Sequence, residues 1–353
     1  MAAIRTVLAG LALVAADFAS AATGMAVIPS HAGEPVTVLY PTQTAPAPLQ
    51  RGPFTLQVAV DAAPAGGNGR LLVLSHGSGG AVWPQFDLGH ALVAAGFTVA
   101  MPLHAGDNVK DSSERGPISW ERRPREVSQA IDAVAAQSAV GGRFAPLQLD
   151  LQRTGAYGMS AGGITVLALA GARWSPALLA RHCDAHIAED FPACVGLATE
   201  LTGGMLDEAK IAIARRVVRA KLGDDGAWRS WQEPRIAAVV AAVPMAAPID
   251  MDSLAVPRVP LGLVRAGQDA WLAPRWHGDA VLAACGAHCT LVADMAQAGH
   301  GSILSPMVTD LSGPAARLLR DPPGFDRGTL APVYAAIAAF FVKNLGTAPA
   351  RSP

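Results

Sequence analysis

The segment Gly158-Met159-Ser160-Ala161-Gly162 constrains the fold of this chain more than any other. A strand-like run, residues 149–157, leads into it, and a run of small and apolar residues with helical character, 161–172, follows it. A tight turn from a strand into a helix brings backbone against backbone, so the positions two before and two after the serine must be small. The sequence therefore predicts a turn that lifts the Ser160 hydroxyl out of a sheet. The hydroxyl would then lie at a helix N-terminus, where free N–H groups favour negative charge.

Short apolar runs alternate with helical segments on both sides of this turn. Such runs are typical of strands that are buried on both faces, and the alternation indicates a mostly parallel central sheet flanked by helices. We expect two early antiparallel strands at residues 36–40 and 54–60. The later strands are expected at residues 71–74, 97–101, 149–157, 236–243, 259–264 and 290–292, and helices at 86–95, 124–136, 161–172 and 330–344.

One region, residues 174–234, breaks the alternation. It contains a pair of cysteines and a basic amphipathic stretch, 209–222, and we interpret it as a helical cap inserted between the helix after Ser160 and the later strands. The rest of the chain reads as one α/β domain over residues 22–345. Residues 346–353 are expected to form a flexible tail.

The first 21 residues have the features of a secretory signal peptide. Arg5 provides the positive charge, residues 6–16 form an apolar run too short to span a bilayer, and Ala19-Ser20-Ala21 fits the cleavage rule. A buried N-terminal helix is the alternative. We expect an exported protein, periplasmic or secreted, and no membrane span, because no later stretch has about 20 uninterrupted apolar residues.

The four cysteines fall into two local pairs, Cys183 with Cys194 and Cys285 with Cys289. An even number in the mature chain suits an oxidising compartment, and local pairing is the simplest of the three possible connectivities. Four free thiols are the alternative. A zinc site with nearby histidines is a third interpretation, although the spacing matches no zinc-finger pattern, and no metal is expected. Those histidines are His182, His186 and His288.

A serine hydroxyl needs a base to take its proton and an acid to hold that base. In folds with this turn, the order along the chain is serine, acid, histidine. Asp269 follows the strand at 259–264 and His300 follows the strand at 290–292, at the sheet edge where open α/β sheets build their sites. The predicted catalytic residues are therefore Ser160, Asp269 and His300.

Other carboxylates compete for the role of the acid. Asp294 ends the strand before His300, and Asp250 and Asp252 follow the strand after the nucleophile. The chain order constrains the acid without fixing its strand, so these remain alternatives to Asp269. Structural roles are expected for the histidines outside this order, which are His76, His90, His104, His182, His186, His277 and His288.

Two backbone N–H groups are expected to form an oxyanion hole. One belongs to Ala161, and the other to the small-residue loop 76–80, where Ser78 is the expected donor. An ordinary glycine-rich turn is the alternative. The loop lacks the Lys and Ser/Thr ending of a phosphate-binding loop, and no G-x-G-x-x-G follows the first strands, so no cofactor is expected.

Charge and hydropathy limit the possible partners. The net charge is −1 and no run of Lys or Arg occurs, so no nucleic-acid partner is expected. Hydrophobic residues make up 51% of the chain, which is enough for a large core. The expected partner is a small-molecule or lipid-like ester, and the sequence carries no indication of oligomeric state.

Five motifs together carry a resemblance to a known family. They are the loop 76–80, the helical segment 121–127, the Ser160 turn, residues 267–269 and residues 299–300. In these the chain resembles the predicted dienelactone-hydrolase-like proteins, which are similar to platelet-activating-factor acetylhydrolases within the α/β-hydrolase superfamily. The resemblance covers residues 36–345. It implies an α/β-hydrolase fold, a triad of Ser160, Asp269 and His300, and hydrolysis of esters or related acyl bonds without a metal.

The chain departs from that family in two ways. True dienelactone hydrolases carry cysteine as the nucleophile, and this chain has Ser160, so dienelactone is not the expected substrate. The segment 174–234 matches the family loosely and is expected to shape the acyl pocket. Tryptophans are a further candidate lining, against ordinary core packing: Trp83, Trp120, Trp228, Trp231 and Trp271.

The sequence thus predicts a serine hydrolase that cleaves carboxylic esters through an acyl-enzyme on Ser160. An amidase, peptidase or acyltransferase would use the same triad, because the pocket selects the leaving group and the acyl acceptor. A non-catalytic binding protein that retains the fold is the alternative from another class, and it predicts a missing triad member.

Overall fold

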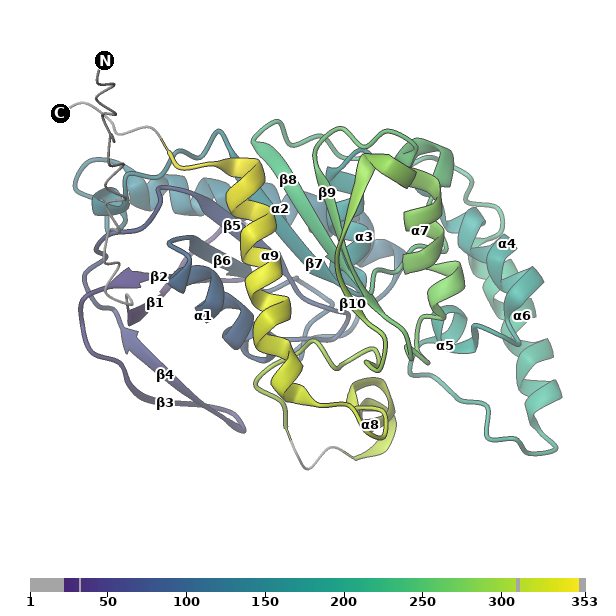
Figure 1. The fold of residues 1–353 in the computed structure, drawn as a ribbon. Helices are drawn as coiled ribbons and strands as arrows, with labels where there is room; N and C mark the ends of the chain where they lie inside the picture. Colours follow the sequence, from purple (N-terminus) through teal and green to yellow (C-terminus); the bar gives the residue numbers. More distant parts are fainter. Residues whose placement is uncertain (1–21, 32, 309–311, 349–353) are drawn as a thin grey trace, which may run out of the picture.

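A single ten-stranded sheet runs through the computed structural model, which describes residues 22–31, 33–308 and 312–348 (Figure 1). Its strand order is β10-β9-β8-β7-β5-β6-β2-β1-β4-β3. The strands are β1 Ala22–Ile28, β2 Val36–Thr42, β3 Ala47–Arg51, β4 Phe54–Val60, β5 Leu71–Ser75, β6 Thr98–Pro102, β7 Thr154–Met159, β8 Ile236–Ala242, β9 Leu261–Ala266 and β10 Cys289–Met295.

Six neighbouring strands of the sheet are parallel, as the alternation of strands and helices predicts. They are β10, β9, β8, β7, β5 and β6. Strands β5, β6 and β7 are buried along their whole length, which explains their continuous apolar runs. Because the six strands are parallel, their carboxyl ends lie at one edge of the sheet. The loops after β5, β7, β9 and β10 share that edge.

The two early strands that the sequence predicts, β2 and β4, do not pair with each other. β2 pairs with β1 and β6, whereas β4 forms a hairpin with β3 and runs parallel to β1. Strands β1 and β3 were not expected from the sequence. Gly24 weakens the strand pattern of β1, yet the strand needs it, because a Cβ there would lie 2.4 Å from the ring of Tyr40.

Helices cover both faces of the sheet (Figure 1). Helices α2, α3 and α7 pack on one face around Ile131 and Ile164, and α1 and α9 pack on the other around Leu92 and Phe341. The helices are α1 Phe86–Ala94, α2 Pro117–Ser138, α3 Ala161–Leu169, α4 Pro176–His186, α5 Phe191–Val195, α6 Asp207–Leu222, α7 Gly278–Cys285, α8 Gly313–Leu319 and α9 Leu330–Leu345.

One helical segment, Arg327–Leu345, is long and apolar enough to cross a membrane by length and composition. It includes α9, whose Ile337 and Phe341 are fully buried against the sheet. Packing in the core accounts for its apolar composition, because a core helix and a membrane span share this property.

The segment 174–234 folds into the three helices α4, α5 and α6, which pack on one another beyond α3 and α7 (Figure 1). Its ends are held together, because Trp174 and Arg229 exchange two backbone hydrogen bonds of 3.0 and 2.8 Å. The insertion therefore leaves the domain and returns to it at the same place.

Two disulfides join Cys183 to Cys194 and Cys285 to Cys289, so the predicted local pairing is confirmed. All four thiols are consumed, and the zinc alternative therefore has no cysteine ligands. Within the described residues, no group of three His, Cys, Asp or Glu side chains is arranged to hold a metal ion.

The chain termini are only partly described. The expected signal peptide, residues 1–21, lies outside the described residues, as do residues 349–353. The first residues of the expected tail are anchored rather than loose. The guanidinium of Arg70 donates to the carbonyls of Gly346 and Thr347 at 3.2 and 2.9 Å, and the N–H of Ala348 donates to the carbonyl of Asn68 at 3.0 Å.

The Cys183–Cys194 disulfide should contribute measurably to stability, because it closes a loop between residues 11 positions apart. Replacing both cysteines by alanine should lower the free energy of unfolding by about 3 kcal/mol through the greater entropy of the unfolded chain. Urea denaturation of the variant and the parent protein measures this. An unchanged unfolding midpoint would contradict a stabilising role for the bond.

Candidate active site

The turn after β7 holds Ser160 in a strained backbone conformation, with φ 59° and ψ −115°. A positive φ is costly for a residue with a side chain, so neighbouring groups must hold it. The N–H of Ser160 donates to the carbonyl of Ala242, and the N–H of Met245 donates to the carbonyl of Ser160, both at 3.0 Å. The end of β8 and the loop after it therefore fix the turn from both sides.

The two glycines of the motif are required by direct backbone contact. A Cβ on Gly158 would lie 1.9 Å from the carbonyl oxygen of Gly162, and one on Gly162 would lie 2.0 Å from the carbonyl oxygen of Ser75. Helix α3 thus begins against the end of β5. This is the geometric reason for the small residues two before and two after Ser160.

The three predicted side chains, far apart in the sequence, are brought together at the carboxyl edge of the sheet. The hydroxyl of Ser160 donates to Nε2 of His300 at 2.9 Å, and Nδ1–H of His300 donates to Asp269 at 2.7 Å. His300 and Asp269 are buried. One oxygen of Asp269 also accepts the backbone N–H groups of Trp271 and Leu272, each at 2.8 Å, which fixes the carboxylate's orientation toward the imidazole.

The rival acids lie elsewhere and are engaged by arginines. Asp294 pairs with Arg265 at 3.0 Å and is nearly half exposed, and Asp250 pairs with Arg173 at 2.6 Å. Among the described hydrogen bonds, none joins these carboxylates or Asp252 to the imidazole of the site. Geometry therefore favours Asp269.

The glycines beside His300 are required by close contacts with residues 319–322. A Cβ on Gly301 would lie 2.6 Å from Cα of Leu319, and one on Gly299 would lie 3.0 Å from Cδ of Pro322. The segment after α8 packs directly on the histidine loop. The glycines therefore allow two stretches of backbone to approach each other.

The loop 76–80 passes beside the serine. A Cβ added to Gly77 would be 3.4 Å from Cβ of Ser160 and 3.3 Å from the sulfur of Met159. A side chain here would crowd the space above the hydroxyl. The loop that follows β5 therefore forms one wall of the site through its main chain.

Both predicted oxyanion donors are available in this arrangement. The N–H of Ala161 is the first of helix α3, so it has no acceptor within the helix. Ser78 uses its hydroxyl on Asp107 at 2.7 Å, and Gly79 donates its N–H to the same carboxylate oxygen. Within the described part of the chain, the N–H of Ser78 has no recorded acceptor.

A second serine–histidine–acid arrangement lies at the end of β5, and no motif in the sequence predicts it. The hydroxyl of Ser75 bonds Nε2 of His104 at 2.7 Å, and Nδ1 of His104 bonds Glu126 at 2.6 Å. Burial, with the charges of Arg123 and Arg122, holds the pKa of His104 well below its usual value, and burial raises the pKa of Glu126. All three side chains are buried, so this set has the hydrogen bonds of a triad without access for a substrate.

A cavity of about 890 Å³ reaches His300. Its walls come from the insertion, residues 188–202, from the loop after β9 and from residues 317–322. Apolar side chains line much of it, including Phe191, Leu197, Leu201 and Trp271. Of the five tryptophans proposed as lining, Trp271 alone contacts this cavity.

Charged side chains also border this cavity, and most of them have partners. Glu189 pairs with Arg275, Glu200 with Arg317, Lys210 with Asp207, and Asp321 with Arg327. Because these charges are paired, the apolar side chains are expected to determine which ligand the cavity accepts.

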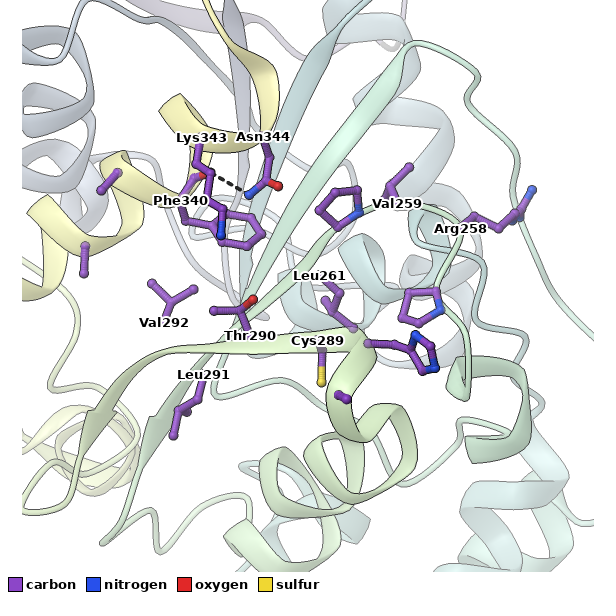
Figure 2. A pocket seen from close by; sticks show the side chains of 16 residues that line it. Arg258, Val259, Leu261, Cys289, Thr290, Leu291, Val292, Phe340, Lys343 and Asn344 are labelled. Carbon is purple, nitrogen blue, oxygen red and sulfur yellow. Dashed lines mark hydrogen bonds between the residues drawn. The ribbon is translucent and has the colours of Figure 1, made fainter.

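A second cavity, of about 600 Å³, lies at the other edge of the sheet (Figure 2). It is formed by the starts of β9 and β10 and the end of α9, with Leu261, Cys289, Phe340 and Lys343 among its lining. The proposed triad lies at the carboxyl ends of the strands, so this cavity has no part in that chemistry.

A buried aspartate ties the insertion to the Ser160 turn. One oxygen of Asp190 bonds Nε2 of both His182 and His277, at 2.8 and 2.9 Å, and Nδ1 of His277 accepts the N–H of Ala246 at 2.9 Å. Burial alone would raise the pKa of Asp190, but the two histidines and the N–H of Ala273 hold it well below the usual value. The loop after β8 thus contacts both the serine and the cavity wall.

Comparisons with known proteins give a fold and no closer assignment. No family model matches the sequence, and no curated protein matches it. A ferulic acid esterase from Streptomyces cinnamoneus has a TM-score of 0.56 and 16% identity, over 95% of this chain and 93% of that chain. A protein from Klebsiella pneumoniae, provisionally described as a dienelactone hydrolase, has a TM-score of 0.45 and 13% identity, over 91% and 98%.

The likeness to the ferulic acid esterase, with the observed sheet order, confirms the predicted α/β-hydrolase fold. At 16% identity it extends to the fold alone. The activity therefore has to be argued from the site.

The contact between Gly162 and Ser75 yields a prediction about folding. A Gly162→Ala change should lower the free energy of unfolding by about 3 kcal/mol or more, because the new methyl group would overlap backbone rather than a mobile side chain. Gly226→Ala, where a Cβ meets nothing within 4 Å, is the matched control and should stay within about 0.5 kcal/mol of the parent. Chemical denaturation of both variants measures this, and equal stabilities would refute the close-contact argument.

Proposed function

On this α/β-hydrolase fold, we propose that the chain is a serine hydrolase that cleaves carboxylic esters through an acyl-enzyme on Ser160. The observation that carries the proposal is the hydrogen-bonded series from Ser160 to His300 to Asp269, in which His300 lines a cavity of about 890 Å³. A serine that is hydrogen-bonded to an oriented imidazole has a base for its proton at the moment of attack.

In the first half-reaction, Oγ of Ser160 attacks the ester carbonyl carbon while Nε2 of His300 takes the hydroxyl proton. The negative charge that forms on the carbonyl oxygen is held by the N–H groups of Ala161 and Ser78. His300 then gives its proton to the leaving alkoxide, the carbon–oxygen bond breaks, and the alcohol departs. The acyl group remains as an ester on Ser160.

In the second half-reaction, water takes the place of the alcohol. Nε2 of His300 removes a proton as the water oxygen attacks the acyl carbon, and it returns that proton to Oγ of Ser160 as the acid leaves. Asp269 stays ionised and stabilises the imidazolium that forms in each half. Each cycle consumes one ester and one water and regenerates the free serine.

The cavity supports an ester with a substantial apolar group. Phe191, Leu197, Leu201 and Trp271 provide apolar surface next to His300, and burial of such surface is worth about 25 cal/mol per Å². The esterase from Streptomyces cinnamoneus acts, by its name, on ferulic acid esters. We take from it only the class of bond, and propose a small-molecule or lipid-like ester as substrate.

We also propose that the protein is exported. The two disulfides support this, because such bonds persist in the periplasm and outside the cell and are rare in the cytosol. The expected signal peptide is the other support. Mass spectrometry of the protein secreted from its host would test the predicted cut after Ala21.

Ser160→Ala should abolish hydrolysis of p-nitrophenyl esters while leaving the fold intact, because the hydroxyl is the attacking group. A fluorophosphonate probe should label the parent protein on Ser160 and leave the variant unlabelled. Ser75→Ala is the matched control, since Ser75 has the same kind of hydrogen bond but is buried, and its variant should still be labelled. Full turnover by the Ser160→Ala variant would remove the nucleophile assignment. The corresponding p-nitroanilides, run beside the esters, distinguish an esterase from an amidase.

Asp269→Asn should lower kcat/KM by at least about 100-fold, because the amide can no longer hold and stabilise the imidazolium. Asp294→Asn should change it by less than about 2-fold, since that carboxylate pairs with Arg265 at the surface. Steady-state kinetics on one ester compares the two. The reverse ranking would move the acid to Asp294.

A further inference from the structure

A buried arginine lies behind the loop that carries Ser78. Arg123 belongs to α2 and has no exposed surface. Its guanidinium donates to the carbonyl of His76 at 2.5 Å, to Asp107 at 2.8 Å and to the hydroxyl of Ser119 at 2.8 Å. A fixed fork of N–H groups thus faces the hidden side of the loop.

The partner carboxylate reaches the other side of the same loop. While one oxygen of Asp107 takes the guanidinium of Arg123, the other accepts the hydroxyl of Ser78 and the N–H of Gly79, both at 2.7 Å. Asp107 is fully buried. Hydrogen bonds to a buried, ionised carboxylate are stronger and more directional than neutral ones, so this contact fixes the loop on both sides of the Ser78 N–H.

The peptide group between Gly77 and Ser78 connects these contacts to the reaction. The carbonyl of Gly77 accepts Nδ1–H of His76 at 2.7 Å, the N–H of Gly80 at 3.1 Å and the guanidinium of Arg123 at 3.5 Å. In a planar trans peptide the C=O and the N–H point in opposite directions. Three donors that hold this oxygen inward therefore aim the N–H of Ser78 outward.

We propose that Arg123 and Asp107 are positioning residues that hold the Ser78 N–H toward the oxyanion of the reaction. The inference rests on the proposed function, because it assigns a role in the same transition state. Neither residue touches the substrate; they act through the loop. A buried ion pair is seldom a net source of stability compared with apolar packing, so its presence here fits a role in geometry.

The test compares Asp107→Asn with a change in a second arginine–aspartate pair, in which only the arginine is buried, at the opposite end of β5. There Arg70, which is also buried, pairs with Asp150 at 2.5 Å, far from the triad. Asp107→Asn should lower kcat by about 10- to 100-fold, which is at most the effect of removing one oxyanion donor. KM should stay within about 3-fold of the parent value. Asp150→Asn should reduce stability but leave kcat unchanged.

The affinity for a trifluoromethyl ketone inhibitor separates a positioning role of Asp107 from a purely structural one. Its adduct with Ser160 places a charged oxygen on the oxyanion donors, so its affinity should fall in the same proportion as kcat in Asp107→Asn. Affinity for the alcohol product should be unchanged. Equal losses of kcat in Asp107→Asn and Asp150→Asn, or an unchanged kcat in a folded Asp107→Asn protein, would overturn the inference.

Ser78→Ala decides the question if Asp107→Asn does not fold. This exposed change removes one of the hydrogen bonds to Asp107 and keeps the backbone N–H. It should lower kcat by about 3- to 10-fold with an unchanged thermal midpoint, as expected for partial loss of orientation. An unchanged kcat refutes the positioning role. Turnover by Ser160→Ala would instead refute the proposed function, so the two failures are distinct.

Discussion

The close approach of helix α3 to the end of strand β5 is the contact on which the rest of the site depends. Gly162 lies so near the carbonyl of Ser75 that a Cβ there would be 2.0 Å away. That contact places the N-terminus of α3 beside the loop that continues β5, and so brings Gly77 against Ser160. The serine, the helix N-terminus and the loop amide of Ser78 then share one small volume. The position of Ser160 relative to the loop after β5 thus follows from one packing contact, and hydrogen bonds with Ala242, Met245 and Asp107 then fix the two segments of backbone.

Two similar serine–histidine–carboxylate sets of hydrogen bonds lie near this contact. They differ in whether a substrate could reach the serine. Ser160 and Ser75 both bond an imidazole that bonds a carboxylate, at comparable distances. Ser160 is partly exposed and its partner His300 lines a cavity, whereas Ser75 and His104 are buried. Burial also lowers the pKa of His104, and its ring links β5 to α2 through Ser75 and Glu126. A triad geometry is therefore not by itself a reactive site; the route to a substrate makes it one.

The sequence predicts the parts of this site that follow from chain order. The motif around Ser160 requires its glycines, and Asp269 and His300 follow strands whose carboxyl ends must meet, so the three could be paired before any coordinates. Chain order favours Asp269 but leaves Asp294, Asp250 and Asp252 as alternatives, because the pairing of Asp294 and Asp250 with arginines depends on contacts across the fold. The positions of Asp107 and Arg123 could not be predicted from the sequence either. Charged residues in a loop and in a helix are ordinarily expected at the surface. Their burial follows from how the loop after β5 folds back, which no local pattern encodes.

The insertion is tied to the Ser160 turn by a buried aspartate and two histidines. Asp190 at the start of α5 binds His182 and His277, and His277 holds the loop after β8 whose neighbouring N–H, that of Met245, bonds Ser160. The cavity wall and the nucleophile's turn are therefore anchored to one short segment of backbone. Residues 196–202 line the cavity and take no part in these hydrogen bonds, so changes there should alter the shape of the cavity without moving the Ser160 turn. Under the proposed function, this division explains why the predicted triad follows from motifs in the sequence, whereas the residues that line the cavity carry no recognisable motif.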